Sequence, residues 1–225
     1  MIVVATNNGI DFLPNLLESM EKYGTDGHMV AVVDTGSTDT TAIEYVRGCG
    51  ERFDFAFPYF INGGRDTGAY ITIFKKFKLL NENFMFMHDS MLIKDHEWLS
   101  RFEHKIDHIT GLVAHSLFPI VSDQWPPCQS IKDKLPFNPD EETWEYGIFG
   151  PIFLAKHRFM LDVIDNGCDK MIPVDRDEAH GTERLWGAIA KKLSWGVKSV
   201  YGLYDHDKLQ QDAYDGLQKF LPIRP

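Results

Sequence analysis

The chain has 225 residues, of which 44% are hydrophobic and 25% charged, and a formal net charge of -10. This length can bury a full core, and the composition is ordinary for a globular enzyme. The acidic balance argues against a primary role in binding duplex DNA, so we expect no nucleic-acid partner. Three scattered cysteines make no disulfide framework, which predicts a reducing, cytoplasmic location. No leader and no transmembrane segment are expected, since no apolar run is long enough to cross a bilayer.

The first half of the chain alternates short apolar runs with amphipathic segments. In chain order, the sequence predicts a strand over 2–6, a helix over 11–23, a strand ending at 33, a helix to about 47, a strand over 53–59, a helix over 67–80 and a strand over 83–87. Pro14 lies in the tolerated first turn of its helix, and Thr38 or Asp39 can cap the next one. This alternation predicts a parallel sheet with right-handed crossovers.

The second half is less regular. The sequence predicts a helix over 95–107, a strand over 111–115, a strand over 146–155, a helix over 178–193 and a strand over 195–201. The prolines within 118–142 predict a long surface loop. No repeat or linker divides the chain, so a single domain is expected over residues 1–225.

Two of the predicted strands end in a carboxylate. One apolar run leads into Asp34, and another leads through His88 into Asp89. In an open α/β sheet, ligands bind at the carboxyl ends of the strands. The two acids therefore predict one pocket for a ligand that carries sugar hydroxyls, phosphates or a metal ion.

Other motif interpretations fit the residues less well. The triplet Asp34-Thr35-Gly36 also occurs in aspartic proteases, but that chemistry needs a second such triplet, and the chain has none. A phosphatase of the haloacid dehalogenase type would need an acid where Gly36 stands. His104, Asp107 and His108, at the end of the predicted 95–107 helix, would share a helix face; they can bind zinc, although a solvated helix face is the simpler explanation.

The string Val32-Val33-Asp34-Thr35-Gly36-Ser37-Thr38-Asp39-Thr40-Thr41 resembles a motif of the GT-A-fold glycosyltransferases, especially the family 2-like group. The segment Asn62-Gly63-Gly64 and the strand that ends in Met87-His88-Asp89-Ser90 follow in the order of that family. The similarity covers about residues 1–115. It implies a GT-A fold, an α/β architecture whose mostly parallel sheet is flanked by helices. It further implies a nucleotide-sugar-binding half over 1–115 and an acceptor and catalytic half over 116–225.

The resemblance also assigns roles in nucleotide-sugar binding. The residues concerned are Thr6, Asn8, Asp34, Ser37, Arg65, Asp66 and His88. Asp34 would accept hydrogen bonds from the base or the ribose. Arg65 would neutralise the diphosphate or contact the base, or it forms a surface salt bridge. Asp66 would orient Arg65 or cap the helix that follows, and Asp39 is expected as a helix cap.

By the same resemblance, Asp89 would hold Mn²⁺ or Mg²⁺ against the diphosphate, with His206 completing the site. Ser90 stands where the family motif has its second acid. This replacement leaves open a non-catalytic module that binds a nucleotide or carbohydrate.

Catalysis needs a base that deprotonates the acceptor hydroxyl. The resemblance points to an acid near the start of a late helix, and Glu183 fits best, with Thr182 as the cap and Asp177 as the second candidate. A solvated helix face is the alternative explanation for these charges. Trp125 and Trp144 are candidate acceptor contacts, or simply packing residues.

The sequence therefore predicts a glycosyltransferase that moves a sugar from a UDP-, GDP- or dTDP-sugar to a sugar or glycan acceptor. The resemblance implies an inverting reaction assisted by a metal ion. A sugar-phosphate nucleotidylyltransferase is the other enzyme class considered, but its usual Gly-rich basic loop is absent after the first strand.

Overall fold

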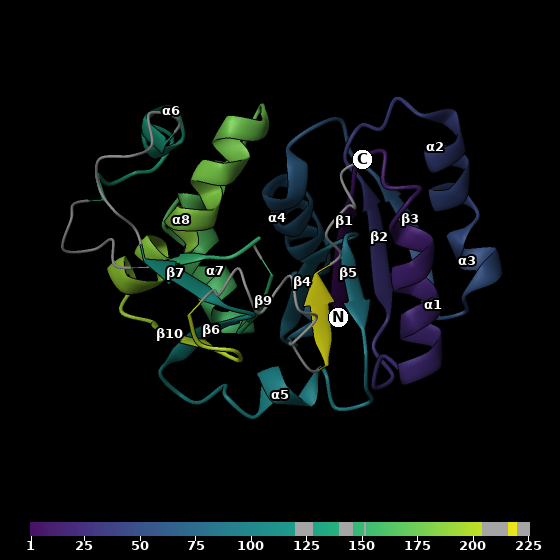
Figure 1. Ribbon diagram of the computed structural model, residues 1–225. Coiled ribbons are helices and arrows are strands. Elements are labelled where there is room, and N and C mark those ends of the chain that lie inside the picture. The colour runs from purple at the N-terminus through teal and green to yellow at the C-terminus, as the bar shows by residue number, and fades with distance from the viewer. Residues whose placement is uncertain (120–127, 140–145, 151, 204–215, 220–225) are drawn as a thin grey trace.

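The computed structural model describes residues 1–119, 128–139, 146–150, 152–203 and 216–219. Its centre is a seven-stranded sheet in the order β10-β6-β9-β4-β1-β2-β3 (Figure 1). The strands are β1 (Ile2–Thr6), β2 (Val30–Asp34), β3 (Ala56–Phe60), β4 (Phe84–His88), β6 (Thr110–Ala114), β9 (Phe153–Ala155) and β10 (Gly196–Ser199). Strand β9 runs antiparallel to both of its neighbours, β4 and β6, whereas the other pairs are parallel.

Two small antiparallel sheets accompany the large one. One pairs β5 (Met91–Ile93) with β11 (Leu217–Lys219), and the other pairs β7 (Leu117–Pro119) with β8 (Tyr146–Ile148). The β5–β11 pair brings a segment from near the end of the chain beside the residues that follow Asp89.

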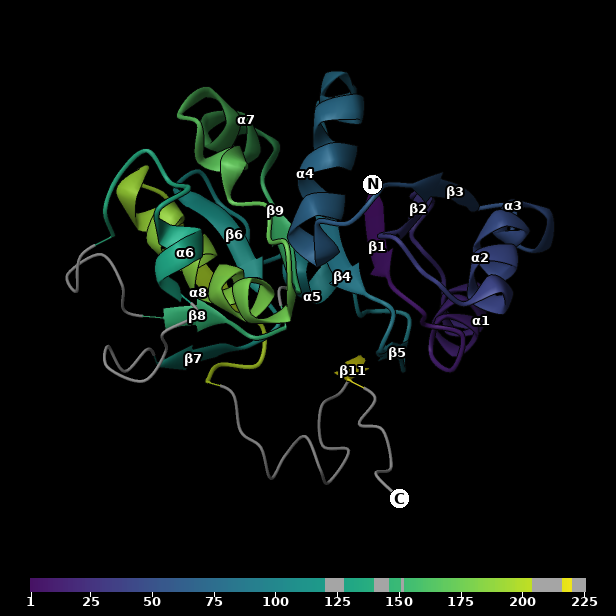
Figure 2. The same ribbon diagram turned by 90° about the horizontal axis from the view of Figure 1, so that it is seen from above.

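Helices cover both faces of the sheet, and Figure 2 shows α1 and α4 on opposite sides of it. They are α1 (Leu13–Tyr23), α2 (Thr40–Arg47), α3 (Cys49–Arg52), α4 (Arg65–Phe77), α5 (Ser100–Glu103), α6 (Cys128–Lys132), α7 (His157–Asp165) and α8 (Arg176–Lys192), with 3-10 turns at Lys78–Leu80 and Cys168–Lys170. One apolar core joins the sheet to α4, α6, α7 and α8, and a second joins it to α1, α2, α3 and α5.

Burial on two faces explains why β1, β2 and β4 are continuous apolar runs. Every residue of these three strands is buried, as expected for parallel strands that helices cover on both sides. On the α4 side, the ring of Tyr70 stacks on that of Phe86 with 4.7 Å between the centroids. Such a pair contributes about 1 kcal/mol beyond its buried area.

The register of the strands determines where the candidate site forms. Thr6 is the partner of Asp34 across β1 and β2, and Ala5 is the partner of His88 across β1 and β4. Because the three strands are parallel and in step, their carboxyl ends meet at one edge of the sheet.

Several local predictions are confirmed. Asp39 caps α2, accepting hydrogen bonds from the N–H groups of Thr41 and Ala42, and Pro14 stands in the first turn of α1. Cys49 and Cys168 are buried free thiols. The cytoplasmic location inferred from the cysteines stays a prediction. None of the described helices is long and apolar enough to cross a membrane.

Other boundaries were wrong. The helix predicted over 95–107 is reduced to α5, because the chain turns after Glu103. The strand predicted over 146–155 is two strands, β8 and β9, in different sheets. Within the expected loop over 118–142, Cys128–Lys132 forms α6.

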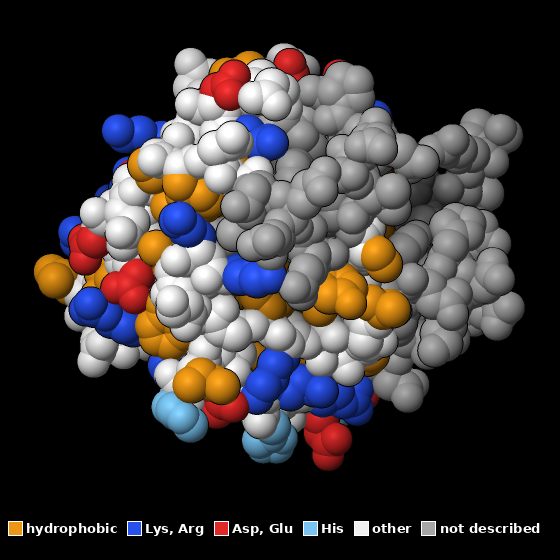
Figure 3. Space-filling view, turned by 90° about the vertical axis from the view of Figure 1, so that its left-hand side faces the viewer, with side chains coloured by type: hydrophobic (Ala, Val, Ile, Leu, Met, Phe, Trp, Pro, Cys, Tyr) orange, Lys and Arg blue, Asp and Glu red, His pale blue; other side chains and the backbone are white. Residues whose placement is uncertain are grey.

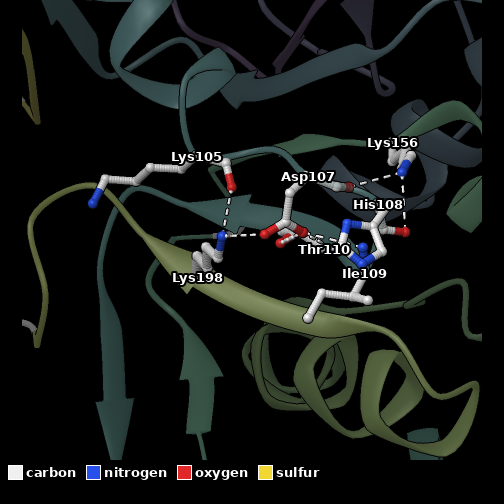
Figure 4. A network of polar contacts seen from close by, with 7 residues as sticks. All are labelled: Lys105, Asp107, His108, Ile109, Thr110, Lys156 and Lys198. Carbon is white, nitrogen blue, oxygen red and sulfur yellow. Dashed lines mark hydrogen bonds and ion pairs between the residues drawn. The ribbon is translucent and has the colours of Figure 1, made fainter.

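The proposed zinc face of His104, Asp107 and His108 disappears with that helix. Asp107 accepts hydrogen bonds from Thr110 and pairs with Lys198 Nζ at 2.7 Å (Figure 4). No group of three or more metal-binding side chains occurs within the described ranges. A solvated surface network therefore explains these residues.

The net charge of the chain does not describe each of its faces. Figure 3 shows a row of Lys and Arg side chains along the lower edge of one side of the molecule, although the formal net charge is -10. Charge near a site must therefore be judged from the residues that line it.

Candidate active site

Asp34 lies at the end of β2, where the chain turns away from the sheet. Its Oδ1 accepts hydrogen bonds from the N–H groups of Gly36 and Ser37, both at 2.8 Å. The residue is 2% exposed, and its Oδ2 is buried without a partner in the part of the chain that the structure describes. A buried acceptor without a hydrogen bond lowers the stability of the fold unless a ligand or a water molecule donates to it.

The loop after β1 is bonded to the loop after β2. The N–H of Asn8 donates to Ser37 Oγ at 2.7 Å, and Asn8 Oδ1 accepts from the N–H groups of Thr38 and Asp39. Asn8 has a φ of 54°, which an Asn tolerates better than most residues. Asn8 and Ser37, both predicted to bind the nucleotide, thus hold the two loops together.

Asp89 follows β4 and contacts the end of β1. Thr6 Oγ1 donates to Asp89 Oδ2 at 2.6 Å. Gly9 packs so closely that a Cβ atom on it would stand 1.8 Å from Asp89 Oδ2 and 2.4 Å from Thr6 Oγ1. Burial raises the pKa of Asp89 to about 6, and the hydrogen bond from Thr6 only partly offsets this. Beside it, His88 Nδ1 and Ser90 Oγ lie 2.8 Å apart.

Arg65 is the first residue of α4. It has a φ of 48°, directly after Gly64 at 86°. A left-handed backbone at a non-glycine residue costs about 1 kcal/mol, and such strain is concentrated at functional sites. The helix begins one residue before Asp66, so the prediction that Asp66 caps it was wrong: Gly64 occupies that position and Asp66 lies in the first turn.

Helix α8 begins earlier than predicted. Asp175 caps it, accepting a hydrogen bond from the N–H of Glu178 at 2.8 Å. Glu183 therefore stands about two turns into the helix, and the expectation that Thr182 caps it was wrong. Thr182 instead donates to the carbonyl oxygen of Ala179 and accepts from Thr67 on α4 at 2.9 Å.

A cavity of about 390 Å³ opens where these elements meet. It is lined by Ala5, Asn7, Arg65, Asp66, His88, Asp89, Ser90, Gly150, Arg176, Ala179, His180 and Glu183. The strand-end acid Asp89 thus shares one cavity with Glu183 on α8.

The structure divides the predicted site residues into three groups. Arg65, Asp66, His88, Asp89 and Glu183 line the cavity. Those that do not line it are Thr6, Asn8, Asp34, Ser37 and Asp177. The predicted metal ligand His206 and the predicted acceptor contacts Trp125 and Trp144 lie outside the described residues.

Sequence reasoning missed two ionisable cavity residues, Arg176 and His180. Together with Glu183 they occupy positions i, i+4 and i+7 of α8, which share one face of a helix. That spacing is visible in the sequence. However, a helix predicted to begin at residue 178 does not include Arg176, so the prediction did not place this residue on the same face as Glu183.

The oxygen atoms that line the cavity can bind a divalent ion together with a phosphorylated ligand. Mg²⁺ and similar ions are commonly held by one or two carboxylates together with substrate phosphates and water. Asp89 supplies one such carboxylate, while the hydroxyl of Ser90 pairs with His88. The described residues thus fit an ion that arrives with a diphosphate, with Asp89 as its protein ligand.

Comparison with solved structures identifies the fold. The mannosyltransferase PcManGT from Pyrobaculum calidifontis, solved with GDP-Man and Mn²⁺, matches with a TM-score of 0.55 and 17% identity over 88% of this chain and 53% of its own. Residues 1–349 of S. aureus TarS match with a TM-score of 0.55 and 15% identity over 88% of this chain and 56% of theirs. No protein-family model and no curated sequence matches.

These likenesses confirm the predicted GT-A fold, with its mostly parallel sheet flanked by helices. The chain spans about half the length of the solved glycosyltransferases that it matches. The TarS structure was also solved with UDP-GlcNAc and with UDP.

Proposed function

We propose that the protein is a glycosyltransferase that moves a sugar from a nucleotide-sugar donor to a hydroxyl of a sugar or glycan acceptor. The observation that carries this proposal is the cavity that Asp89, which follows β4, and Glu183 of α8 both line. A transferase of this class needs one group for the leaving diphosphate and another for the attacking hydroxyl, placed around the same sugar.

The donor nucleotide would lie along the carboxyl edge of the sheet. Asp34 presents a buried Oδ2 without a described partner, which a base imide or a ribose hydroxyl would satisfy. The bonded loops after β1 and β2 hold this carboxylate in place without consuming that oxygen. UDP-, GDP- and dTDP-sugars are the candidate donors.

The diphosphate would lie between Asp89 and Arg65. A Mn²⁺ or Mg²⁺ ion held by Asp89 would offset the charge that develops on the departing nucleotide. Arg65 offers a planar, permanently charged group that matches phosphate oxygens. The Mn²⁺ present in the PcManGT structure supports testing this ion first.

Glu183 would be the base of an inverting displacement. The acceptor oxygen bonds to the anomeric carbon, the bond from that carbon to the diphosphate oxygen breaks, and the acceptor proton passes to the Glu183 carboxylate. In the described part of the chain, Asp177 does not reach the cavity, so it becomes the weaker candidate.

A panel of nucleotides tests the proposal. UDP, GDP and dTDP are added to the protein with Mn²⁺ and with EDTA, and thermal unfolding is followed. One of them should raise the melting temperature, since a ligand at 100 times its Kd stabilises the fold by about 2.7 kcal/mol. If none of the three shifts the unfolding transition under either condition, the donor site is wrong.

A further inference from the structure

The described arginines fall into two groups. Most have a protein partner: Arg47 lies over Phe60, Arg52 over Tyr45, Arg101 pairs with Asp95, Arg158 pairs with Asp162, and Arg184 donates to the carbonyl oxygen of His180. The side chains of Arg65 and Arg176 form no hydrogen bond, ion pair or ring contact with any described residue. These two are also the arginines that line the cavity.

The two arginines approach the cavity from different halves of the chain. Each is the first residue of its helix, Arg65 on α4 and Arg176 on α8. The helices contact each other, and a buried hydrogen bond between Thr67 and Thr182 joins them close to the cavity. The first turn of α4 therefore lies beside the second turn of α8, and the positive end of the α4 dipole adds a partial positive charge near the cavity.

Backbone geometry fixes one of these arginines, and exposure keeps the other charged. Arg65 keeps a strained φ of 48°, which surrounding contacts must maintain. Arg176 is exposed and lines the cavity, and its guanidinium is charged there. Asp66, Asp89 and Glu183 line the same cavity, but within the described part of the chain neither arginine forms an ion pair with any of them, which leaves both guanidinium groups available to a bound anion.

We propose that Arg65 and Arg176 clamp the diphosphate of the nucleotide donor from opposite sides. This inference rests on the proposed function and extends it to a residue of the catalytic half. Under this proposal the two arginine side chains supply part of the diphosphate binding. Their contribution should persist when the divalent ion is removed. The clamp also makes the diphosphate a bridge between α4 and α8.

Binding of diphosphates and monophosphates to charge-removing variants tests the clamp. The nucleoside diphosphate that stabilises the wild type best is titrated calorimetrically in EDTA and in Mn²⁺, beside the matching monophosphate. Arg65→Gln and Arg176→Gln are compared with the wild type. Arg158→Gln is the matched control, because Arg158 pairs with Asp162 on the surface of α7 and does not line the cavity.

The expected result is selective. Each cavity variant should weaken diphosphate binding at least about tenfold, the value of one charge-assisted hydrogen bond. Monophosphate binding should change less than about threefold, and Arg158→Gln should bind both nucleotides as the wild type does. The wild type should still bind the diphosphate in EDTA.

Three results would overturn the clamp. They are unchanged diphosphate binding by Arg176→Gln, an equal loss for monophosphate and diphosphate, or complete loss of wild-type binding in EDTA. The equal loss would mean that the arginines balance the cavity carboxylates instead. All three leave the donor site intact, whereas a wild type that binds no nucleotide would refute the proposed function itself.

Discussion

The two walls of the cavity are held by different means. Beside the wall on the sheet side, main-chain N–H groups fix two loops that do not themselves line the cavity: two donate to Asp34 Oδ1, and two donate to Asn8 Oδ1. On the α8 side, the cavity residues are side chains at helical spacing. The start of that helix is held by Lys134, which donates to Glu178 Oε2 at 2.5 Å and to the carbonyl oxygen of Ile172 at 2.9 Å.

This difference predicts how each wall responds to substitution. Substitutions on the sheet side should introduce steric overlap with the closely packed backbone and so move an acidic side chain. Changes on α8 should remove a chemical group and leave the fold intact. Three substitutions test this contrast in order of decreasing effect, and a fourth tests a surface network that does not line the cavity.

Glu183→Gln should have the largest effect. Removing a general base slows a reaction about 10²–10⁴-fold, while nucleotide binding should stay close to that of the wild type. Donor turnover in the presence and absence of candidate acceptors measures the loss. Asp177→Asn is the matched control on the same helix, outside the cavity. Full activity of Glu183→Gln would place the base elsewhere, and a wild type that binds nucleotide without turnover would indicate a binding module.

Gly9→Ala should disturb the sheet side. The added methyl group would overlap Asp89 Oδ2 and Thr6 Oγ1, so one of them must move. Overpacking of this kind costs about 3 kcal/mol, and it should also reduce the effect of Mn²⁺ on nucleotide binding. Urea unfolding measures the cost. Gly48→Ala is the control, since its nearest contact would be an ordinary 3.5 Å; equal stability of the two variants would contradict the close approach.

Lys134→Met should loosen the start of α8. Glu178 is 6% exposed and also accepts from the N–H of Val174. Loss of Lys134 therefore leaves a buried carboxylate with fewer donors, at a cost of about 1.5 kcal/mol in the free energy of unfolding. Lys170→Met, at an exposed lysine, should cost less.

The pH dependence of stability gives a second measure of the same contact. Burial tends to raise the pKa of Glu178, but the hydrogen bonds from Lys134 and Val174 lower it overall. A carboxyl group whose pKa is lower in the folded state stabilises the protein above its unfolded pKa. That contribution is lost as the pH falls through the folded-state value. The wild type should therefore lose more stability than Lys134→Met as the pH falls below about 4.

Asp107→Asn should have the smallest effect. The Lys198 ammonium and the Thr110 hydroxyl hold the pKa of Asp107 well below its usual range, but the pair lies at the surface. Asparagine can still accept from Thr110, so a slight fall in melting temperature is expected. Nucleotide binding should not change, because none of these residues lines the cavity. A clear loss of binding would contradict the assignment of this network to the surface.

Local signals in the sequence predicted much of the first half. Asp39 was expected as a cap, and the strand that ends in Asp34 was placed correctly, because caps and short apolar runs depend on neighbours along the chain. The same reasoning failed at Asp66. There, two glycines with positive φ let the helix begin two residues early, at Arg65, which a pattern of hydrophobic residues does not reveal.

The sequence by itself determined that one buried strand ends at Asp34 and that another is followed by Asp89, since a short apolar run bounded by turn residues can form few other structures. It also contained Glu183 as a candidate base. Only the tertiary structure decided that Arg176 and His180 join that residue at one cavity. It likewise decided that β9 enters antiparallel between β4 and β6, and that Gly9 abuts Asp89. These features depend on contacts such as Thr67 with Thr182, between residues 115 positions apart, for which periodicity within a short window carries no information.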